Sequence, residues 1–149
     1  MESAKKVSLF YKIFSLLSVV RGYNILVLVI AQYLASIYIF SPKKSLTTVM
    51  FDLHLFFVVF ATVCVVAGGY IINNFYDVKA DKINRPHKAG LDSFVKQETT
   101  LSIYFLLNFI GVIAGFLVSW KAALFFSLYI FSIWSVSYTH LTLPTISSV

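Results

Sequence analysis

The chain has 149 residues, of which 59% are hydrophobic and only 12% are charged, and its mean hydropathy is +0.85. Soluble domains carry about 25% charged residues, so this composition excludes an ordinary soluble protein and predicts one integral to a membrane. The net charge of +6 would suggest nucleic-acid binding in a soluble chain. Here we assign it to basic residues that flank membrane spans, and we expect no nucleic-acid partner. The single cysteine, Cys64, lies in an apolar run and excludes a disulfide framework within the chain.

The first span-length stretch is residues 23–40, which carry no charge and follow a basic, amphipathic segment, residues 1–21. A signal peptide would instead have a short apolar core and a small-residue cleavage site. A helix needs roughly 20 residues to cross the hydrocarbon of a bilayer, so we predict a first transmembrane helix here. A short polar connection, residues 41–52, follows it.

The second apolar run, residues 53–76, ends in a polar pattern that hydrophobicity does not explain. Asn73, Asp77 and Asp81 recur every four residues, which puts them on one face of a helix, and Arg85 extends the line by one turn. Ionised side chains at membrane depth cost roughly 2.5 to 3.5 kcal/mol each, so they usually mark a functional site. His54 lies at the opposite end of the span and is predicted to be an interfacial side chain.

Two interpretations of this pattern remain open from the residues alone. Asp77 and Asp81 could form a solvated helix end, paired with Lys79, Lys82 and Arg85. They could instead bind a divalent metal, because Mg²⁺ uses one or two carboxylates while phosphates and waters fill its other positions. The amide oxygen of an asparagine on the same face could complete such a site.

The spacing Asn-x-x-x-Asp-x-x-x-Asp of residues 73–81, followed by Arg85-Pro86, resembles the first aspartate-rich motif of the UbiA superfamily of intramembrane prenyltransferases. That motif is usually written N-D-x-x-D-x-x-x-D and is followed by R-P. Asn74 stands where many members have aspartate, which removes one possible metal ligand. The resemblance extends along the chain to about Trp134.

A second point of resemblance lies at the start of the first span. Residues 21–24, Arg-Gly-Tyr-Asn, are similar to the R-P-x-N that opens the first helix in the family, with Gly22 in place of the proline. Asn24 then corresponds to an asparagine that faces the active-site cavity. An interfacial polar cluster would explain the same residues, since arginine and tyrosine often anchor helix ends.

The resemblance implies an all-α, multi-span transmembrane bundle, to which this chain contributes about four helices as residues 1–135. It implies Mg²⁺-dependent transfer of a prenyl group from a polyprenyl or geranylgeranyl diphosphate to a lipid-soluble acceptor, either a quinone precursor or a prenylated glycerol phosphate. By the same resemblance the catalytic carboxylates are Asp77 and Asp81, the metal ligands are these two with Asn73, and the substrate-binding residues are Asn24, Asn73, Lys82 and Arg85.

The distribution of basic residues predicts the orientation in the membrane. Lysine and arginine concentrate before residue 22 and within residues 79–98, whereas the other two loops carry only Lys43, Lys44 and Lys121. The positive-inside rule then puts the N-terminus and the loop after Asp77 in the cytoplasm, with the protein integral to the inner or plasma membrane.

The third span is predicted over residues 101–120, and a fourth begins at Ala122 and continues to about residue 135. Gly111 and Gly115 form a G-x-x-x-G pattern, which allows a neighbouring helix to approach closely. Asn108 is expected to make a hydrogen bond between helices.

The sequence from Val136 turns polar before the fourth segment is long enough to cross a membrane. It closely resembles the translation of a transposon-type sequencing-library adapter. We therefore expect residues 136–149 to be non-native, and we assign no role to His140. On this expectation the chain is an N-terminal fragment, inactive alone, and lacks the second aspartate-rich motif of the family.

Two other classes of protein would fit parts of the pattern. A membrane transporter could carry acidic residues in a span, although it would need them near the bilayer midplane. A structural membrane subunit would explain the helices and leave the motif to coincidence. A second D-x-x-x-D motif after a further pair of helices in the uninterrupted gene would decide for the enzyme.

Overall fold

The computed structural model describes residues 22–84 and 97–142, with side chains for 22–76 and 99–139. Within these ranges every regular element is a helix and no strand occurs, which confirms the predicted all-α class. The elements are α2 (Gly22–Ala35), the π-helix η1 (Ser36–Phe40), α3 (Leu46–Met50), α4 (Leu53–Asn84), α5 (Gln97–Val118) and α6 (Trp120–Thr142).

Four stretches of these helices are long and apolar enough to cross a membrane, as predicted. They are Gly22–Phe40, Leu53–Tyr76, Thr99–Val118 and Trp120–Thr139. The expectation that the fourth segment is too short was wrong, because α6 continues past residue 135 to Thr142. Its hydroxyl groups bond to carbonyls of the same helix: Ser132 to Leu128 at 2.8 Å and Thr139 to Val136 at 3.0 Å. Such bonds satisfy polar side chains without interrupting the helix.

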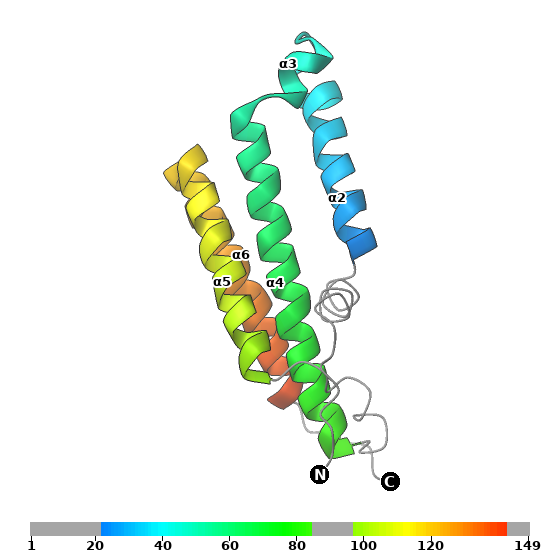
Figure 1. Cartoon of the computed structure of the whole chain (residues 1–149), viewed down its shortest axis with the longest axis vertical. Coiled ribbons are helices and arrows are strands. Elements are labelled where there is room, and N and C mark those ends of the chain that lie inside the picture. Colours follow the sequence, from blue (N-terminus) through cyan, green and yellow to red (C-terminus); the bar gives the residue numbers. More distant parts are fainter. Residues whose placement is uncertain (1–21, 85–96, 143–149) are drawn as a thin grey trace, which may run out of the picture.

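Each long helix runs antiparallel to the one before it in sequence, and α4 lies at the centre of the bundle (Figure 1). Helix α4 contacts α5, α6 and α2, and α5 contacts α6. The C-terminal end of α4 lies at the same end of the bundle as the start of α5 and the end of α6, whereas α3 lies at the opposite end (Figure 1). The polar motif predicted from the sequence therefore belongs to the end of the central helix.

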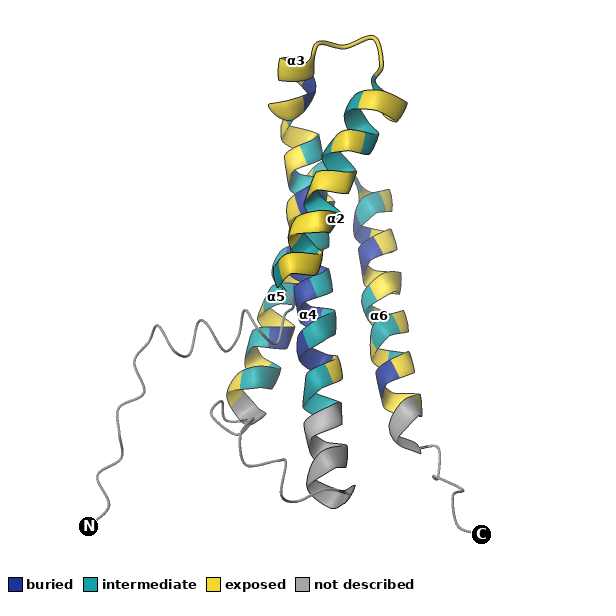
Figure 2. Cartoon of the chain, turned by 90° about the vertical axis from the view of Figure 1, so that its right-hand side faces the viewer, coloured by how far each residue is buried: buried dark blue, intermediate teal, exposed yellow. Residues whose placement is uncertain are grey.

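The buried residues lie mainly where α4, α5 and α6 meet (Figure 2). One cluster joins Ala61, Val65, Ala114 and Phe126, and a second joins Ile71, Ile72 and Tyr104. Helix α2, in contrast, contains no buried residue. Large apolar side chains that point outward, such as those of α5, match a hydrocarbon solvent and need no polar cover.

Glycines permit the close approach of these helices, as the G-x-x-x-G pattern predicted. A Cβ added at Gly111 would lie 2.8 Å from Cγ2 of Val65 in α4, and one added at Gly115 would lie 2.8 Å from the ring of Phe126 in α6. Successive glycines of α5 thus contact two different helices. Small residues at such points let helices pack by van der Waals contact in a membrane.

Asn108 behaves differently from the expected bridge between helices. Its side-chain amide donates a hydrogen bond to the carbonyl of Tyr104, one turn earlier in α5, at 3.0 Å. The amide group also lies over Gly68 of α4, where an added Cβ would come within 3.1 Å of it. The side chain is buried and therefore satisfies part of its hydrogen-bonding capacity within its own helix.

The connection between the first two spans, predicted only as a short polar segment, contains a short helix, α3. The hydroxyl of Ser45 accepts a bond from the backbone N–H of Thr48 at 3.3 Å and caps α3. Asp52 in turn accepts from the N–H of Leu55 at 3.0 Å and caps α4, and this bond holds the carboxyl pKa below its usual value. The imidazole of His54 beside it is exposed, and its interfacial position in the membrane stays a prediction.

Candidate functional site

One face of α4 lines two adjoining hollows and leads toward the predicted motif. Thr62, Val66, Tyr70 and Asn73 follow one another at helical spacing, and all of them line these hollows. The backbone of α4 stays helical through Asn84. Positions 77 and 81 therefore follow Asn73 by one and two turns in the same continuous helix.

The side chains of several predicted site residues lie outside the described part of the chain. The side chains of Asp77, Asp81 and Lys82 fall outside the described residues, and so does all of Arg85. No group of three or more His, Cys, Asp or Glu side chains that could hold a metal occurs among the described ones. The roles of these four residues and the metal-binding role of Asn73 stay predictions.

The hollow nearest the motif has a volume of about 440 Å³ and lies between α4 and α6. Helix α4 contributes Val66, Gly69, Tyr70 and Asn73, and α6 contributes Tyr129, Ser132, Ile133, Val136 and Ser137. Asn73 is exposed and lines this space directly. We call this space the motif hollow. All but two of its lining residues precede the C-terminal stretch that we assigned to adapter sequence.

Asn24, predicted from the start of the first span, comes to the same region. Its amide Nδ2 donates a hydrogen bond to the hydroxyl of Tyr70 at 3.1 Å. Tyr70 lines the motif hollow, so this bond ties the beginning of α2 to the wall of that space. Asn24 thus contacts the helix that carries Asn73, three residues before that asparagine.

The second hollow lies deeper in the bundle, between α2, α4 and α6, and has a volume of about 220 Å³. Gln32 of α2 donates from Nε2 to the hydroxyl of Thr62 in α4 at 3.0 Å, and that hydroxyl donates to the carbonyl of Val58 at 2.8 Å. The Oε1 atom of Gln32 is buried and has no hydrogen-bond partner within the described part of the chain. We call this space the deep hollow.

Gln32 and Thr62 were not among the predicted site residues. The available signal was an amide in the otherwise apolar run of residues 23–40, because buried polar side chains within membrane spans are costly and tend to find partners. The partner itself was not readable, since many hydroxyl side chains occur in the other spans.

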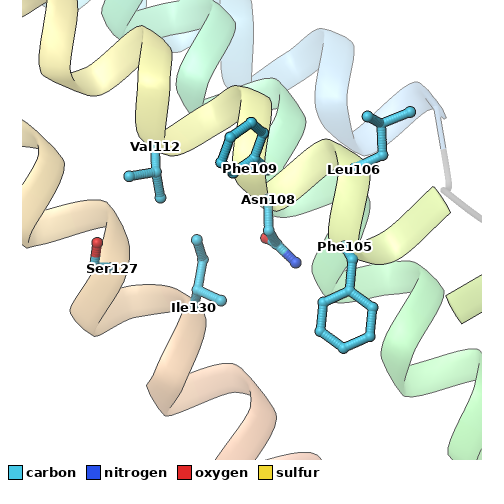
Figure 3. A pocket seen from close by; sticks show the side chains of 7 residues that line it. All are labelled: Phe105, Leu106, Asn108, Phe109, Val112, Ser127 and Ile130. Atoms are coloured by element: carbon cyan, nitrogen blue, oxygen red, sulfur yellow. The ribbon is translucent and has the colours of Figure 1, made fainter. Parts of the chain in front are cut away.

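The largest of these hollows, about 670 Å³, is elsewhere (Figure 3). It is lined by Phe105, Leu106, Asn108, Phe109 and Val112 of α5 with Ser127 and Ile130 of α6. Figure 3 shows the Asn108 amide directed into the space between these two helices. No residue of α4 lines it, so size alone does not make it the candidate site, and we assign that role to the motif hollow.

The described architecture defines a helical membrane protein with a hollow beside the end of its central helix. The family model described as the UbiA prenyltransferase family matches residues 25–147. The chain therefore belongs to this family, in agreement with the resemblance of its motif.

Two relatives are similar to part of the chain. Digeranylgeranylglyceryl phosphate synthase of Sulfurisphaera tokodaii is 33% identical over 55 residues, which are 37% of this chain and 20% of the relative. The protein of the same name from Pyrococcus horikoshii is 36% identical over 59 residues, 40% of this chain and 21% of the relative. The aligned stretches thus span about a fifth of each relative. No solved structure matches the chain.

Proposed function

We propose that the full-length gene product transfers a prenyl group from an isoprenoid diphosphate to a lipid-soluble acceptor, with Mg²⁺ as cofactor. The observation that carries this proposal is the Asn73 face of α4, which lines a hollow and continues as helix through positions 77 and 81 in a chain of the UbiA family. A transporter or a structural subunit would give no reason for this combination.

The donor set suits a magnesium ion. Asn73, Asp77 and Asp81 offer one amide and two carboxylate oxygens, and hard cations prefer oxygen ligands. Mg²⁺ commonly takes only one or two carboxylates and completes its coordination with waters and substrate phosphates. The chemistry that such an ion supplies is neutralisation of charge on the departing diphosphate.

The chain's own cations have a complementary role in this proposal. Lys82 follows Asp81 by one residue, and Arg85 follows it by four residues, about one helical turn. Arginine can donate two parallel hydrogen bonds to phosphate oxygens, and lysine acts as a point charge. They would hold the diphosphate as the allylic C–O bond breaks. Asn24, held by Tyr70 at the wall of the motif hollow, would position the substrate from α2.

The acceptor that we favour is a prenylated glycerol phosphate rather than a quinone precursor. The support is the name of the two relatives, digeranylgeranylglyceryl phosphate synthase. The matching donor is geranylgeranyl diphosphate. We further propose that the N-terminus and the motif end of α4 face the cytoplasm, where water-soluble diphosphate headgroups can reach the motif.

The test is prenyl transfer by the purified full-length gene product in lipid or detergent. Labelled geranylgeranyl diphosphate is supplied with a geranylgeranylglyceryl phosphate or with an aromatic quinone precursor, each with Mg²⁺ or with a chelator. We expect Mg²⁺-dependent product with the glycerol phosphate acceptor. Transfer to the aromatic acceptor alone would reject our acceptor assignment, and transfer that is unaffected by chelation would reject the metal assignment.

A further inference from the structure

The motif hollow and the deep hollow form one line along α4. They share Val66 and Tyr129 as lining residues, so the two spaces adjoin. Asn73 lines the first and Thr62 lines the second. These residues are eleven positions apart in one helix, which corresponds to about 16 Å along its axis. An extended apolar chain that starts at the motif end would run through the motif hollow toward Gln32.

The motif hollow includes the hydroxyl side chains of Ser132 and Ser137 in its wall, whereas the deep hollow is lined mainly by apolar side chains. Leu28, Val65 and Phe126 surround the deep hollow, together with the ring of Phe125, which stacks on Tyr129 with centroids 6.3 Å apart. Besides Tyr129, the polar residues of the deep hollow are the pair Gln32–Thr62, joined by a hydrogen bond of 3.0 Å. The buried Oε1 of Gln32 still needs a donor, and an isoprenoid chain has none to offer.

We propose that Gln32 sets the upper length of the prenyl chain that the protein accepts. This inference rests on the proposed prenyl transfer and adds a specificity-determining residue to it. A chain that ends short of Gln32 leaves room in the deep hollow for water, which can donate to Oε1. A longer chain displaces that water and covers Oε1 with hydrocarbon, so it binds less tightly.

The inference predicts opposite results for two variants that break the same hydrogen bond. Gln32→Met keeps a similar shape and removes the amide, so a longer chain no longer covers an unpaired polar atom. Thr62→Val removes only the hydroxyl and leaves the whole Gln32 amide without its partner. The first variant should relax the length limit, and the second should keep it or make it stricter.

The measurement is kcat/KM of the full-length protein with farnesyl, geranylgeranyl and farnesylgeranyl diphosphates at a fixed acceptor concentration. For Gln32→Met we expect the farnesylgeranyl-to-geranylgeranyl ratio to rise about tenfold, mainly through KM. For Thr62→Val we expect the ratio to stay constant or to fall. Ser127→Ala, a change in the separate hollow between α5 and α6, is the control and should leave the ratio unchanged.

Two results would overturn the inference. If both variants lower turnover equally with all three diphosphates, the pair only holds α2 against α4. If both variants shift the ratio in the same direction, loss of the Gln32–Thr62 hydrogen bond, and not the Gln32 amide itself, accounts for the change in chain-length preference. Wild-type protein that transfers no prenyl group from any of the three diphosphates would instead reject the proposed function itself, which separates the two failures.

Discussion

Replacing Gly111 by alanine tests how α5 packs against α4. The added methyl carbon would lie 2.8 Å from Cγ2 of Val65 and 3.3 Å from the backbone oxygen of Ala61. Neither atom can move away easily, because a helical valine is restricted at χ1 and the oxygen belongs to the main chain. Overpacking of this kind costs about 1 to 3 kcal/mol. The better helix propensity of alanine offsets about 1 kcal/mol of this cost, so we expect a net loss of up to about 2 kcal/mol.

Gly69→Ala is the matched control, because the chemical change is the same. Its methyl carbon would meet the Cδ1 atom of Ile133 at 3.1 Å, and this atom is the far end of a flexible side chain that can rotate away. Because the same gain in helix propensity applies here without a comparable clash, we expect this variant to keep the free energy of unfolding or to raise it by up to about 1 kcal/mol. Reversible unfolding in mixed micelles, or steric trapping in bicelles, measures both variants on one scale.

A second-site change sharpens the test. Val65→Ala removes the methyl group that the new carbon would touch, so Gly111→Ala should be less harmful in that background. The difference is a coupling energy, which is expected only between residues in contact. Equal losses for Gly111→Ala and Gly69→Ala, or zero coupling to Val65, would refute this account of the α4–α5 interface.

Three further predictions concern the rest of the chain. The pKa of Asp52 is lowered, so its ionised carboxylate caps and stabilises α4 at pH values above the ordinary pKa of 3.8, and this stabilisation is lost as the pH falls through the folded-state pKa. Asp52→Asn should flatten the decline of thermal stability at acid pH. An unchanged decline would contradict the capping role of Asp52. Single cysteines at Lys5 and Lys88 should be labelled by impermeant reagents only from the cytoplasmic side and one at Lys43 only from outside, and the reverse pattern would overturn the orientation. Resequencing genomic DNA should find codons unrelated to residues 136–149, and finding the same codons there would remove the adapter assignment.

The positions of the spans could be read from the sequence because an apolar run of the right length has few alternatives to a transmembrane helix. The end of α6 could not, because the hydroxyl groups of Ser132 and Thr139 look polar in sequence but bond to their own helix. Helix α3 was missed for a related reason. It begins at a Ser45 cap whose hydrogen bond reaches only to Thr48. In sequence, the same serine and threonine residues are equally typical of a polar loop.

The candidate site also has a part that the sequence predicts and a part that it does not. The face shared by Asn73 and positions 77 and 81 follows from helical spacing alone. The neighbours of that face depend on which helices pack together, and this is a tertiary property. Neither the bond from Asn24 to Tyr70 nor that from Gln32 to Thr62 has a local signal, because the partners are 46 and 30 residues apart.

The central claim is that Asp77 and Asp81 hold Mg²⁺ and diphosphate, and charge-removing variants of the full-length protein test it most directly. Asp77→Asn and Asp81→Asn keep the side-chain size, so folding and expression should stay close to wild type. Mg²⁺-dependent prenyl transfer should fall at least about a hundredfold, which corresponds to roughly 2.7 kcal/mol of transition-state stabilisation. Lys79→Ala, at a position on the other side of the helical repeat, is the control and should have little effect. Equal, mild losses for Asp77→Asn and Lys79→Ala would contradict the assignment.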